Sequence, residues 1–335
     1  MMTSRTLRRI IYLTLPKLAP SFRFRVHQYL NEIEKHGFRV TVKEIPKGTI
    51  QRIRLANTLT EYDVVVLQKR LFQPWFVWFL RNKAKTLVYD FDDAVMYRSS
   101  MHGSKHSANR KRRFRSIVSK ADIVVAGNNY LKSMADAYAR QTVVIPTGID
   151  IDSYLPHRQQ SQTITIGWIG SKTNLNYLKD LIEPLNKLYM SFPNFRLKVV
   201  CDGFVEGFKC PVVKKVWCEE DEVSDIQSFD IGVLPLKDDY WTKGKCALKL
   251  LQYMSCGLAS VSSNLMFISS IIKHGHNGLL SNSIEQWYEN LIVLLRKPQL
   301  RERMGNHARL SVEGKFDIKT ISRKYVEVFD MVIRK

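Results

Sequence analysis

The segment 230-DIGVLPLKDDYWTKGKCALKLLQYMSCGLASVSSN-264 decides the fold. An apolar strand runs to Pro235, a polar loop follows, a helix extends from about Lys245 to Gly257, and a second apolar strand begins at Ala259. Strand, helix and strand in this order are typical of a βαβ unit, in which a helix packed on one face of the sheet joins two parallel strands. The segment therefore predicts an α/β fold.

The same alternation of apolar runs and amphipathic stretches continues in both directions along the chain. Strands are predicted at 10–15, 39–45, 62–68, 86–92, 122–127, 142–148, 164–170, 196–202, 212–217, 230–236, 259–263 and 278–280. Helices are predicted at 21–37, 174–190, 245–256, 267–273, 283–296, 298–311 and 317–333.

A polar stretch, 149-IDIDSYLPHRQQSQ-162, interrupts the pattern and is interpreted as a linker. We therefore expect one domain at 1–155, a second at 156–316, and a C-terminal helix at 317–335 that could cross back to the first domain. The expected fold class is α/β, with two Rossmann-like domains facing across a cleft. Ligands of open α/β sheets bind beyond the carboxyl ends of the strands, so this cleft is the expected site.

The chain is strongly basic, with a formal net charge of +21 over 335 residues. Residues 1–155 hold 27 Lys and Arg against 12 Asp and Glu, whereas residues 156–335 hold 25 against 19. A basic first half implies an anionic partner, such as nucleic acid, an acidic membrane surface or a phosphate-rich substrate. The five cysteines form no C-x-x-C pair and indicate reduced thiols rather than a zinc site or a disulfide framework.

Apolar stretches of the length that crosses a membrane are not found in the sequence. The run Ile10–Leu15 is short and is followed by Pro16 and Lys17, so we predict a strand there rather than a signal segment. The run 74-PWFVWFL-80 is far shorter than the roughly 20 residues that a spanning helix needs. We expect a cytoplasmic protein that could lie on the inner face of a membrane.

Cations crowd the predicted start of the helix at 245–256. Lys243 and Lys245 precede its first turn, and Lys249 lies one turn further on. The free N–H groups of a helix N-terminus add partial positive charge. The arrangement predicts an anion site suited to a phosphate or diphosphate.

Several segments resemble, in the same order, the GT-B glycosyltransferases of the retaining nucleotide-sugar group (family 4 type). They are 121-ADIVVAGNNYLKS-133, 142-TVVIPTGIDIDSY-154, 164-ITIGWIGSKTNLNYL-178 and 249-KLLQYMSCG-257. In addition, Ser21–Arg25 (SFRFR) is similar to the first loop and helix of a subset that acts on polysaccharide. The resemblance implies transfer of a sugar from a nucleoside-diphosphate sugar to an acceptor hydroxyl, with retention of configuration, in polysaccharide or lipid-linked glycan biosynthesis. It implies no metal and no cofactor beyond the donor substrate.

The resemblance also implies donor-binding residues. The matching positions are Gly170, Ser171, Lys172, Asn174, Lys243, Gly244 and Gln252. The family commonly has two glutamates where this chain has Gly244 and Gln252, and often an arginine where it has Ser171. An amide can still donate to and accept from a ribose hydroxyl, whereas Gly244 offers only its backbone N–H.

Catalytic and acceptor-side residues are expected from the same comparison. Lys245 and Lys249 should stabilise the leaving diphosphate, because preorganised cations act most strongly where charge develops in the transition state. Asp93 and His102 are expected to act near the acceptor hydroxyl. The acceptor side is expected to include Ser21, Arg23, Arg25 and Asp92.

The acidic stretch 86-TLVYDFDDAVMY-97 has two further interpretations. Asp90-Phe91-Asp92 could be the D-x-D motif of a metal-dependent sugar transferase or of an aspartyl-phosphate phosphatase. A second α/β domain, beginning at Ile164, argues against the first, and Asp93 at the fourth position argues against the second. We expect no metal here and place Asp92 and Asp93 on the acceptor side.

The run 102-HGSKHSANRKRRFRS-116 concentrates positive charge. Contact with anionic lipid or a lipid-diphosphate acceptor is the favoured interpretation, ahead of a solvated surface and of nucleic acid. The aromatic segment Trp75–Phe79 is predicted to face the core, with an interfacial contact as the alternative. Two other functions also remain open: a nucleotide-sugar epimerase on the same scaffold, and a non-catalytic GT-B-like protein that binds nucleic acid or membrane.

Overall fold

The computed structural model describes residues 8–17, 19–157 and 162–334. The chain divides into two compact units. The first unit comprises Met1–Gly148, Asp239–Cys246 and Ile318–Lys335, and the second comprises Ile149–Asp238 and Ala247–Asp317. The division therefore begins the second unit at residue 149, compared with the expected 156, and assigns the C-terminal helix to the first unit.

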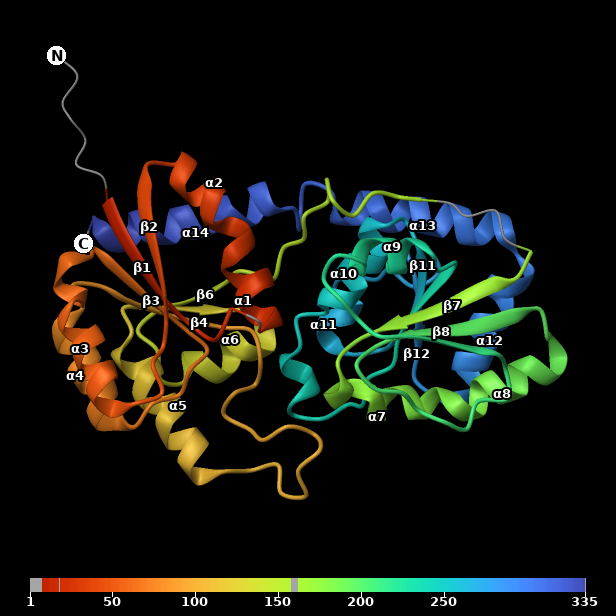
Figure 1. The fold of residues 1–335 in the computed structure, drawn as a ribbon, viewed down its shortest axis with the longest axis horizontal. Coiled ribbons are helices and arrows are strands. Elements are labelled where there is room, and N and C mark those ends of the chain that lie inside the picture. Colours follow the sequence, from red (N-terminus) through yellow and green to blue (C-terminus); the bar gives the residue numbers. More distant parts are fainter. Residues whose placement is uncertain (1–7, 18, 158–161, 335) are drawn as a thin grey trace, which may run out of the picture. The chain divides into compact units, whose positions relative to one another are not determined.

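The first unit is built on a parallel six-stranded sheet in the order β2-β1-β3-β4-β5-β6 (Figure 1). Its strands are β1 (Arg8–Thr14), β2 (Phe38–Glu44), β3 (Val64–Gln68), β4 (Leu87–Phe91), β5 (Ile123–Ala126) and β6 (Thr142–Val144). Its helices are α1 (Pro20–Arg25), α2 (Leu30–Lys35), α3 (Thr49–Asn57), α4 (Pro74–Lys83), α5 (Ala108–Lys120), α6 (Asn129–Asp136) and α14 (Ile318–Ile333).

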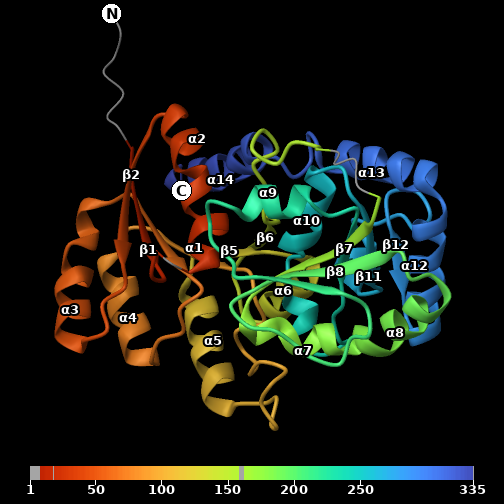
Figure 2. The same cartoon turned by 45° about the vertical axis from the view of Figure 1, so that its right-hand side comes forward.

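Alternate strand residues point to opposite faces of this sheet, and each face is covered by helices. On one face, residues such as Val64 and Val66 of β3 share an apolar cluster with Tyr325 and Phe329 of α14 and with residues of α1 and α2. On the other face, Phe114 of α5 packs on residues of β4. Helices α3, α4 and α5 lie side by side over this second face (Figure 2).

The second unit has its own parallel six-stranded sheet, in the order β12-β11-β10-β7-β8-β9. Its strands are β7 (Ile164–Ile169), β8 (Phe195–Val200), β9 (Val212–Lys215), β10 (Ile231–Leu234), β11 (Ala259–Ser263) and β12 (Leu279–Ser281). Its helices are α7 (Leu175–Leu178), α8 (Ile182–Ser191), α9 (Glu222–Gln227), α10 (Leu248–Ser255), α11 (Met266–Ser269), α12 (Ile284–Arg296) and α13 (Pro298–Val312). The strand order reverses between β7 and β10, the kind of switch point at which open α/β sheets bind ligands.

All twelve predicted strands are present among the described residues, but two predicted helices are interrupted and another begins later than expected. The helix expected at 21–37 breaks at Val26, whose φ is −131°. The helix expected at 174–190 is divided into α7 and α8 by a 3-10 turn. The helix expected from Lys245 begins only at Leu248, because Ala247 adopts a left-handed conformation with φ 51°.

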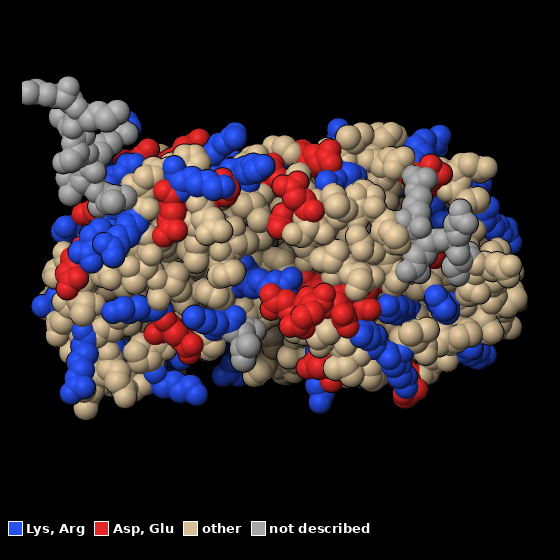
Figure 3. Space-filling model, turned by 45° about the horizontal axis from the view of Figure 1, so that its top comes forward, with Lys and Arg blue, Asp and Glu red and all other residues tan. Residues whose placement is uncertain are grey.

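The excess of positive charge is visible at the surface. On the face shown in Figure 3, lysine and arginine side chains are scattered widely, whereas acidic side chains gather most densely in one place.

The described residues include no helix with the length and apolar character that crossing a bilayer requires.

Candidate active site

The acidic residues at the end of β4 and just after it have different environments. Asp90 is buried and accepts hydrogen bonds from Nε of Arg25 at 2.7 Å and from the hydroxyl of Tyr325 at 2.6 Å. Arg25 also donates to the backbone carbonyl of Ile145 at 2.6 Å and is only 1% exposed. Asp90 and Arg25 therefore brace the core of the first unit, and burial leaves Arg25 no surface for the expected acceptor-side role.

Asp92 and Asp93, in contrast, lie in a cluster with two lysines. Nζ of Lys69 is 3.1 Å from Oδ1 of Asp92 and also bonds Oδ2 of Asp93, and Nζ of Lys245 is 3.4 Å from Oδ1 of Asp93. Lys69 adopts a left-handed φ of 55°, an uncommon conformation for a residue with a side chain. The cluster lies at the carboxyl edge of the sheet, where parallel sheets bind their ligands.

The electrostatics of this cluster favour the ionised forms of Asp93 and Lys69. Burial alone would raise the pKa of Asp93, but Lys69 and Lys245 bring that pKa below its ordinary value. Burial alone would lower the pKa of Lys69, but Asp92 and Asp93 raise it above its ordinary value. A cation at these carboxylates would have to compete with two ammonium groups. Across the described ranges, no group of three or more His, Cys, Asp or Glu side chains could hold a metal ion.

The segment 239–246 belongs to the first unit, although it lies between β10 and α10 in the sequence. Asn128, the buried N-cap of α6, donates from Nδ2 to the backbone carbonyls of Lys243 and Lys245 at 3.1 and 3.0 Å. Lys243 lies in a 3-10 turn, and Lys245 follows it. The expectation that both lysines stand at the start of α10 is therefore wrong, because their segment is bonded to α6 instead.

The packing around Gly244 explains why position 244 holds no acidic side chain. A Cβ atom on Gly244 would lie 2.5 Å from the backbone nitrogen of Ala94, a distance that real Cβ atoms do not reach. Gly127 is packed as closely on the same segment, since a Cβ there would lie 2.4 Å from Sγ of Cys246. The close approach of two backbones excludes any side chain at position 244 in this conformation.

In the second unit, Lys249 reaches the loop that follows β7. Its Nζ lies 4.5 Å from the ring centroid of Trp168, and a Cβ atom on Gly170 would be only 2.4 Å from that nitrogen. The ammonium of Lys249, the second residue of α10, therefore lies against the backbone of Gly170. The loop after β7 and helix α10, both of which the sequence predicted to bind the donor, are therefore in contact.

The rest of the loop after β7 is open to solvent. Ser171 Oγ lies 3.0 Å from Thr173 Oγ1 and accepts from Nδ2 of Asn174 at 3.1 Å. The backbone N–H of Lys172 donates to Oδ1 of Asp202 at 2.7 Å, while its side chain is exposed. Gly170, Ser171, Lys172 and Asn174 thus form one loop, which meets Lys249 at Gly170.

Gln252 is placed differently from its expected role. Its amide Nε2 donates to Oε1 of Glu222 and to the hydroxyl of Tyr154, both at 2.9 Å, and all three residues are buried. Trp217 donates from Nε1 to the other oxygen of Glu222 at 3.0 Å. The Nε2 group of Gln252 is thus engaged inside a buried network that includes Tyr154 from the predicted linker, and its expected ribose contact stays a prediction.

The remaining expected residues of the first unit lie in two different segments. His102 is exposed in the loop before α5, with Nδ1 3.3 Å from Oγ of Ser99. The backbone carbonyl of Ser21 accepts from Gln68 Nε2 at 2.6 Å, and the guanidinium of Arg23 lies 4.4 Å from the ring centroid of Phe24. Ser21 and Arg23 belong to α1, whereas His102 belongs to the loop before α5.

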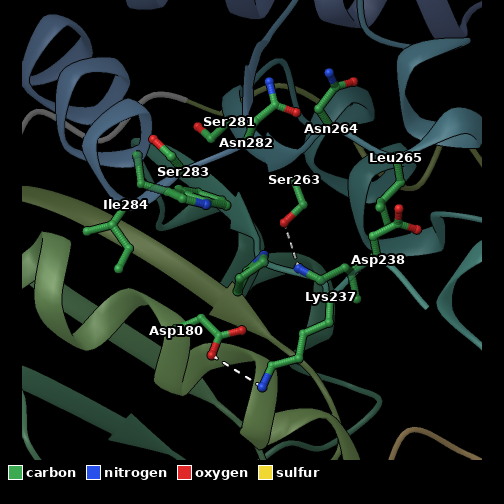
Figure 4. A pocket seen from close by; sticks show the side chains of 13 residues that line it. Asp180, Lys237, Asp238, Ser263, Asn264, Leu265, Ser281, Asn282, Ser283 and Ile284 are labelled. Atoms are coloured by element: carbon green, nitrogen blue, oxygen red, sulfur yellow. Dashed lines mark hydrogen bonds and ion pairs between the residues drawn. The ribbon is translucent and has the colours of Figure 1, made fainter.

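A pocket of ≈ 330 Å³ opens at the carboxyl ends of β10, β11 and β12 (Figure 4). Oγ of Ser263 accepts from the backbone N–H of Leu236 at 2.8 Å, and Nζ of Lys237 lies 3.6 Å from Oδ1 of Asp180. Its lining is rich in hydroxyl and amide groups: Ser263, Asn264, Ser281, Asn282 and Ser283. Such groups can bond the hydroxyls of a sugar or ribose.

Sequence reasoning did not single out the lining of this pocket. The signal was present, because Ser263-Asn264 and Ser281-Asn282-Ser283 fall at the ends of two strands that are neighbours in the sheet. Polar residues at the carboxyl ends of adjacent parallel strands converge on one edge. The pocket does not include Lys249 or Gly170, so it is separate from the loop after β7.

Residues 163–297 match the model of a known family, described as glycosyl transferases group 1. The chain carries a group 1 glycosyl transferase domain. The domain occupies most of the second unit, including both strands of the switch point and Lys249. The expected resemblance to group 1 glycosyltransferases is thereby confirmed for these residues.

A curated relative matches part of this chain. N-acetyl-alpha-D-glucosaminyl L-malate synthase of Bacillus anthracis is 27% identical over 118 residues, which are 35% of this chain. The match spans 30% of the length of that relative.

Solved structures resemble the chain over nearly its whole length. A glycosyltransferase from Rickettsia africae superposes with a TM-score of 0.75, at 14% identity, over 98% of this chain and 99% of that one. The sucrose-phosphate synthase of Thermosynechococcus elongatus gives 0.72 at 14% identity, with coverage of 98% and 99%. HepE of Anabaena, in complex with UDP and glucose, gives 0.71 at 15% identity, with coverage of 97% and 100%. These likenesses confirm the expected α/β fold class with two Rossmann-like domains.

Proposed function

We propose that the protein transfers a sugar from a nucleoside-diphosphate sugar to a hydroxyl of a glycan or lipid-linked acceptor. The observation that carries the proposal is the ammonium of Lys249 held against Gly170 within the group 1 glycosyl transferase domain. HepE, which has the same fold, has been solved with UDP and with UDP-glucose, and this supports a nucleotide-sugar donor.

The donor diphosphate is proposed to bind between the loop after β7 and the start of α10. Lys249, the backbone of Gly170 and Ser171, and the free N–H groups of α10 would all present positive charge to it. Negative charge grows on the diphosphate as the sugar departs, so these groups would bind the transition state more strongly than the ground state. Lys172 and Asn174, which follow Ser171 in the same loop, are proposed to contact the nucleotide.

Transfer is proposed to retain the anomeric configuration and to need neither a metal nor another cofactor. Lys249 and the helix N–H groups can neutralise the diphosphate without a cation. Asp92 and Asp93 are proposed to orient the acceptor from the first unit, since they follow β4 at the carboxyl edge of its sheet. The pathway is proposed to be polysaccharide or lipid-linked glycan synthesis, at the cytoplasmic side of a membrane.

Thermal stabilisation by nucleotides tests the proposal directly. UDP, GDP and their sugar conjugates are compared with an oligonucleotide, and release of nucleoside diphosphate is then measured with and without EDTA. Stabilisation by a nucleoside diphosphate and turnover that survives EDTA support the proposal, and NMR of the product reports the anomeric outcome. No response to any nucleotide, together with salt-sensitive oligonucleotide binding, would contradict it.

A further inference from the structure

Helix α4 exposes two tryptophans. Trp75 and Trp78 are 53% and 59% exposed, while Phe76, Val77 and Leu80 on the opposite side of the helix are buried. The expectation that Trp75–Phe79 faces the core holds for the buried side alone. Two indoles left on the outside of one helix are unusual, because a tryptophan side chain normally buries a large apolar area.

The neighbouring helices extend this apolar surface. Helix α3 packs beside α4, and its Ile50 is 68% exposed. Helix α5 packs against the other side of α4, and Nη2 of Arg112 donates to Oε1 of Gln73, the N-cap residue of α4, at 3.4 Å. Three adjacent helices (Figure 2) therefore carry the exposed apolar side chains Ile50, Trp75 and Trp78.

The charge of the three helices has a single sign. Helices α3 and α4 carry two Lys or Arg residues each and α5 carries six, whereas none of the three carries Asp or Glu. Among the residues that the structure describes, Arg81 alone of these ten pairs with a carboxylate, that of Asp122 at 3.4 Å. The charge is therefore largely uncompensated and available to an anionic partner.

We propose that this outer face of α3–α5, formed by Ile50, Arg54, Trp75, Trp78, Arg112 and Arg115, docks on the surface of an anionic lipid bilayer. Indole rings favour the boundary between headgroups and acyl chains, and basic side chains around them are attracted to anionic headgroups. The proposal deepens the proposed function, since a lipid-linked acceptor would be met at that surface.

The chemistry of the surface favours lipid over nucleic acid. A single strand binds in a basic groove with aromatic side chains on which the bases stack. Here the aromatic and aliphatic groups stand on the exposed sides of packed helices, and Ile50 offers no ring for stacking. Apolar groups that project from a basic surface can instead insert into a bilayer interface.

Vesicle co-sedimentation of the whole protein tests the proposal. Vesicles of phosphatidylcholine are compared with vesicles in which part of it is replaced by phosphatidylglycerol, and we expect binding only to the second. Trp75→Ser with Trp78→Ser, and separately Arg112→Gln with Arg115→Gln, should each lower the partition coefficient by roughly tenfold or more. Matched controls on the second unit, Met190→Ser with Leu310→Ser and Lys179→Gln with Arg303→Gln, should bind like the wild type.

The outcomes separate this proposal from the proposed function. Stabilisation by nucleotides should be unchanged in every variant, so a failure of donor binding would not affect the vesicle result. Equal binding to neutral and anionic vesicles, or wild-type binding by both surface variants, would overturn the membrane proposal. So would binding of an oligonucleotide, with no vesicle binding, that is lost in the Arg112→Gln, Arg115→Gln variant.

Discussion

Nε of Arg25 lies 2.7 Å from Oδ1 of Asp90, and the two side chains are only 1% and 3% exposed. The pair joins α1 to the end of β4, and Tyr325 of α14 bonds the second carboxylate oxygen at 2.6 Å. Three segments that are distant in the sequence thus meet at one buried carboxylate.

Asp90→Asn should destabilise the first unit strongly. The substitution leaves the Arg25 guanidinium buried without its counter-charge, and loss of one partner of a buried pair costs about 3–5 kcal/mol of unfolding free energy. Urea denaturation measures the change. As a control, Asp136→Asn breaks the exposed pair with Lys132 and should cost less than about 1 kcal/mol. Equal effects of the two substitutions would refute the bracing role of Asp90.

Asp93→Asn should change how stability depends on pH. Because Lys69 and Lys245 hold the pKa of Asp93 below its ordinary value, its ionisation stabilises the fold above the unfolded pKa of about 4. This contribution is lost as pH falls through the folded pKa. The variant should therefore melt at a lower temperature than the wild type near neutrality, and the difference should shrink in acid. Asp152→Asn, at an exposed site, serves as the control, and a difference that persists at low pH would contradict the assignment.

Gly244→Glu restores the family's acidic residue but should not improve activity. Any side chain at position 244 must displace the backbone at Ala94, so even Gly244→Ala should lower the unfolding free energy by about 1–3 kcal/mol. Gly103→Ala is the matched control, because a Cβ there meets nothing within 4 Å. A stable Gly244→Glu variant with raised turnover would show that segment 239–246 adopts another conformation in the working enzyme.

Lys249→Ala should lower kcat by about 100-fold, the scale of losing one transition-state donor. Steady-state release of nucleoside diphosphate provides the measurement, and Lys179→Ala is the control on an exposed helix turn. Circular dichroism should show that the variant is folded. Unchanged kinetics in a folded variant would remove Lys249 from the proposed site.

Local periodicity was sufficient for the sheets but not for the loops between them. Buried parallel strands are short apolar runs such as 64-VVVLQ-68, and their pattern needs no knowledge of the partner strands. Ala247 shows the opposite case. Alanine is the best helix former, so the sequence predicts a helix through it, yet tertiary packing places it in a left-handed conformation.

The candidate site was partly predictable for the same reason. Lys249 and Gly170 stand out because each adjoins a regular element whose position follows from the pattern. The partners of Lys245 and Gln252 were not predictable, since Asp93 and Glu222 are brought to them only by tertiary folding. A resemblance to a family identifies equivalent positions. It does not reveal that the Nε2 group of Gln252 already donates hydrogen bonds to Glu222 and Tyr154.

The division of the chain affects how such a protein can be inherited or engineered. The first unit is assembled from three separate stretches, and one of them, 239–246, is encoded within the gene region of the second. A single crossover after Gly148 between two relatives would therefore mix segments that must fit one another, namely Asp90 with Tyr325 and Asn128 with the carbonyl of Lys245. Chimaeras should tolerate such an exchange only when the short insert and the last helix travel with the N-terminal half.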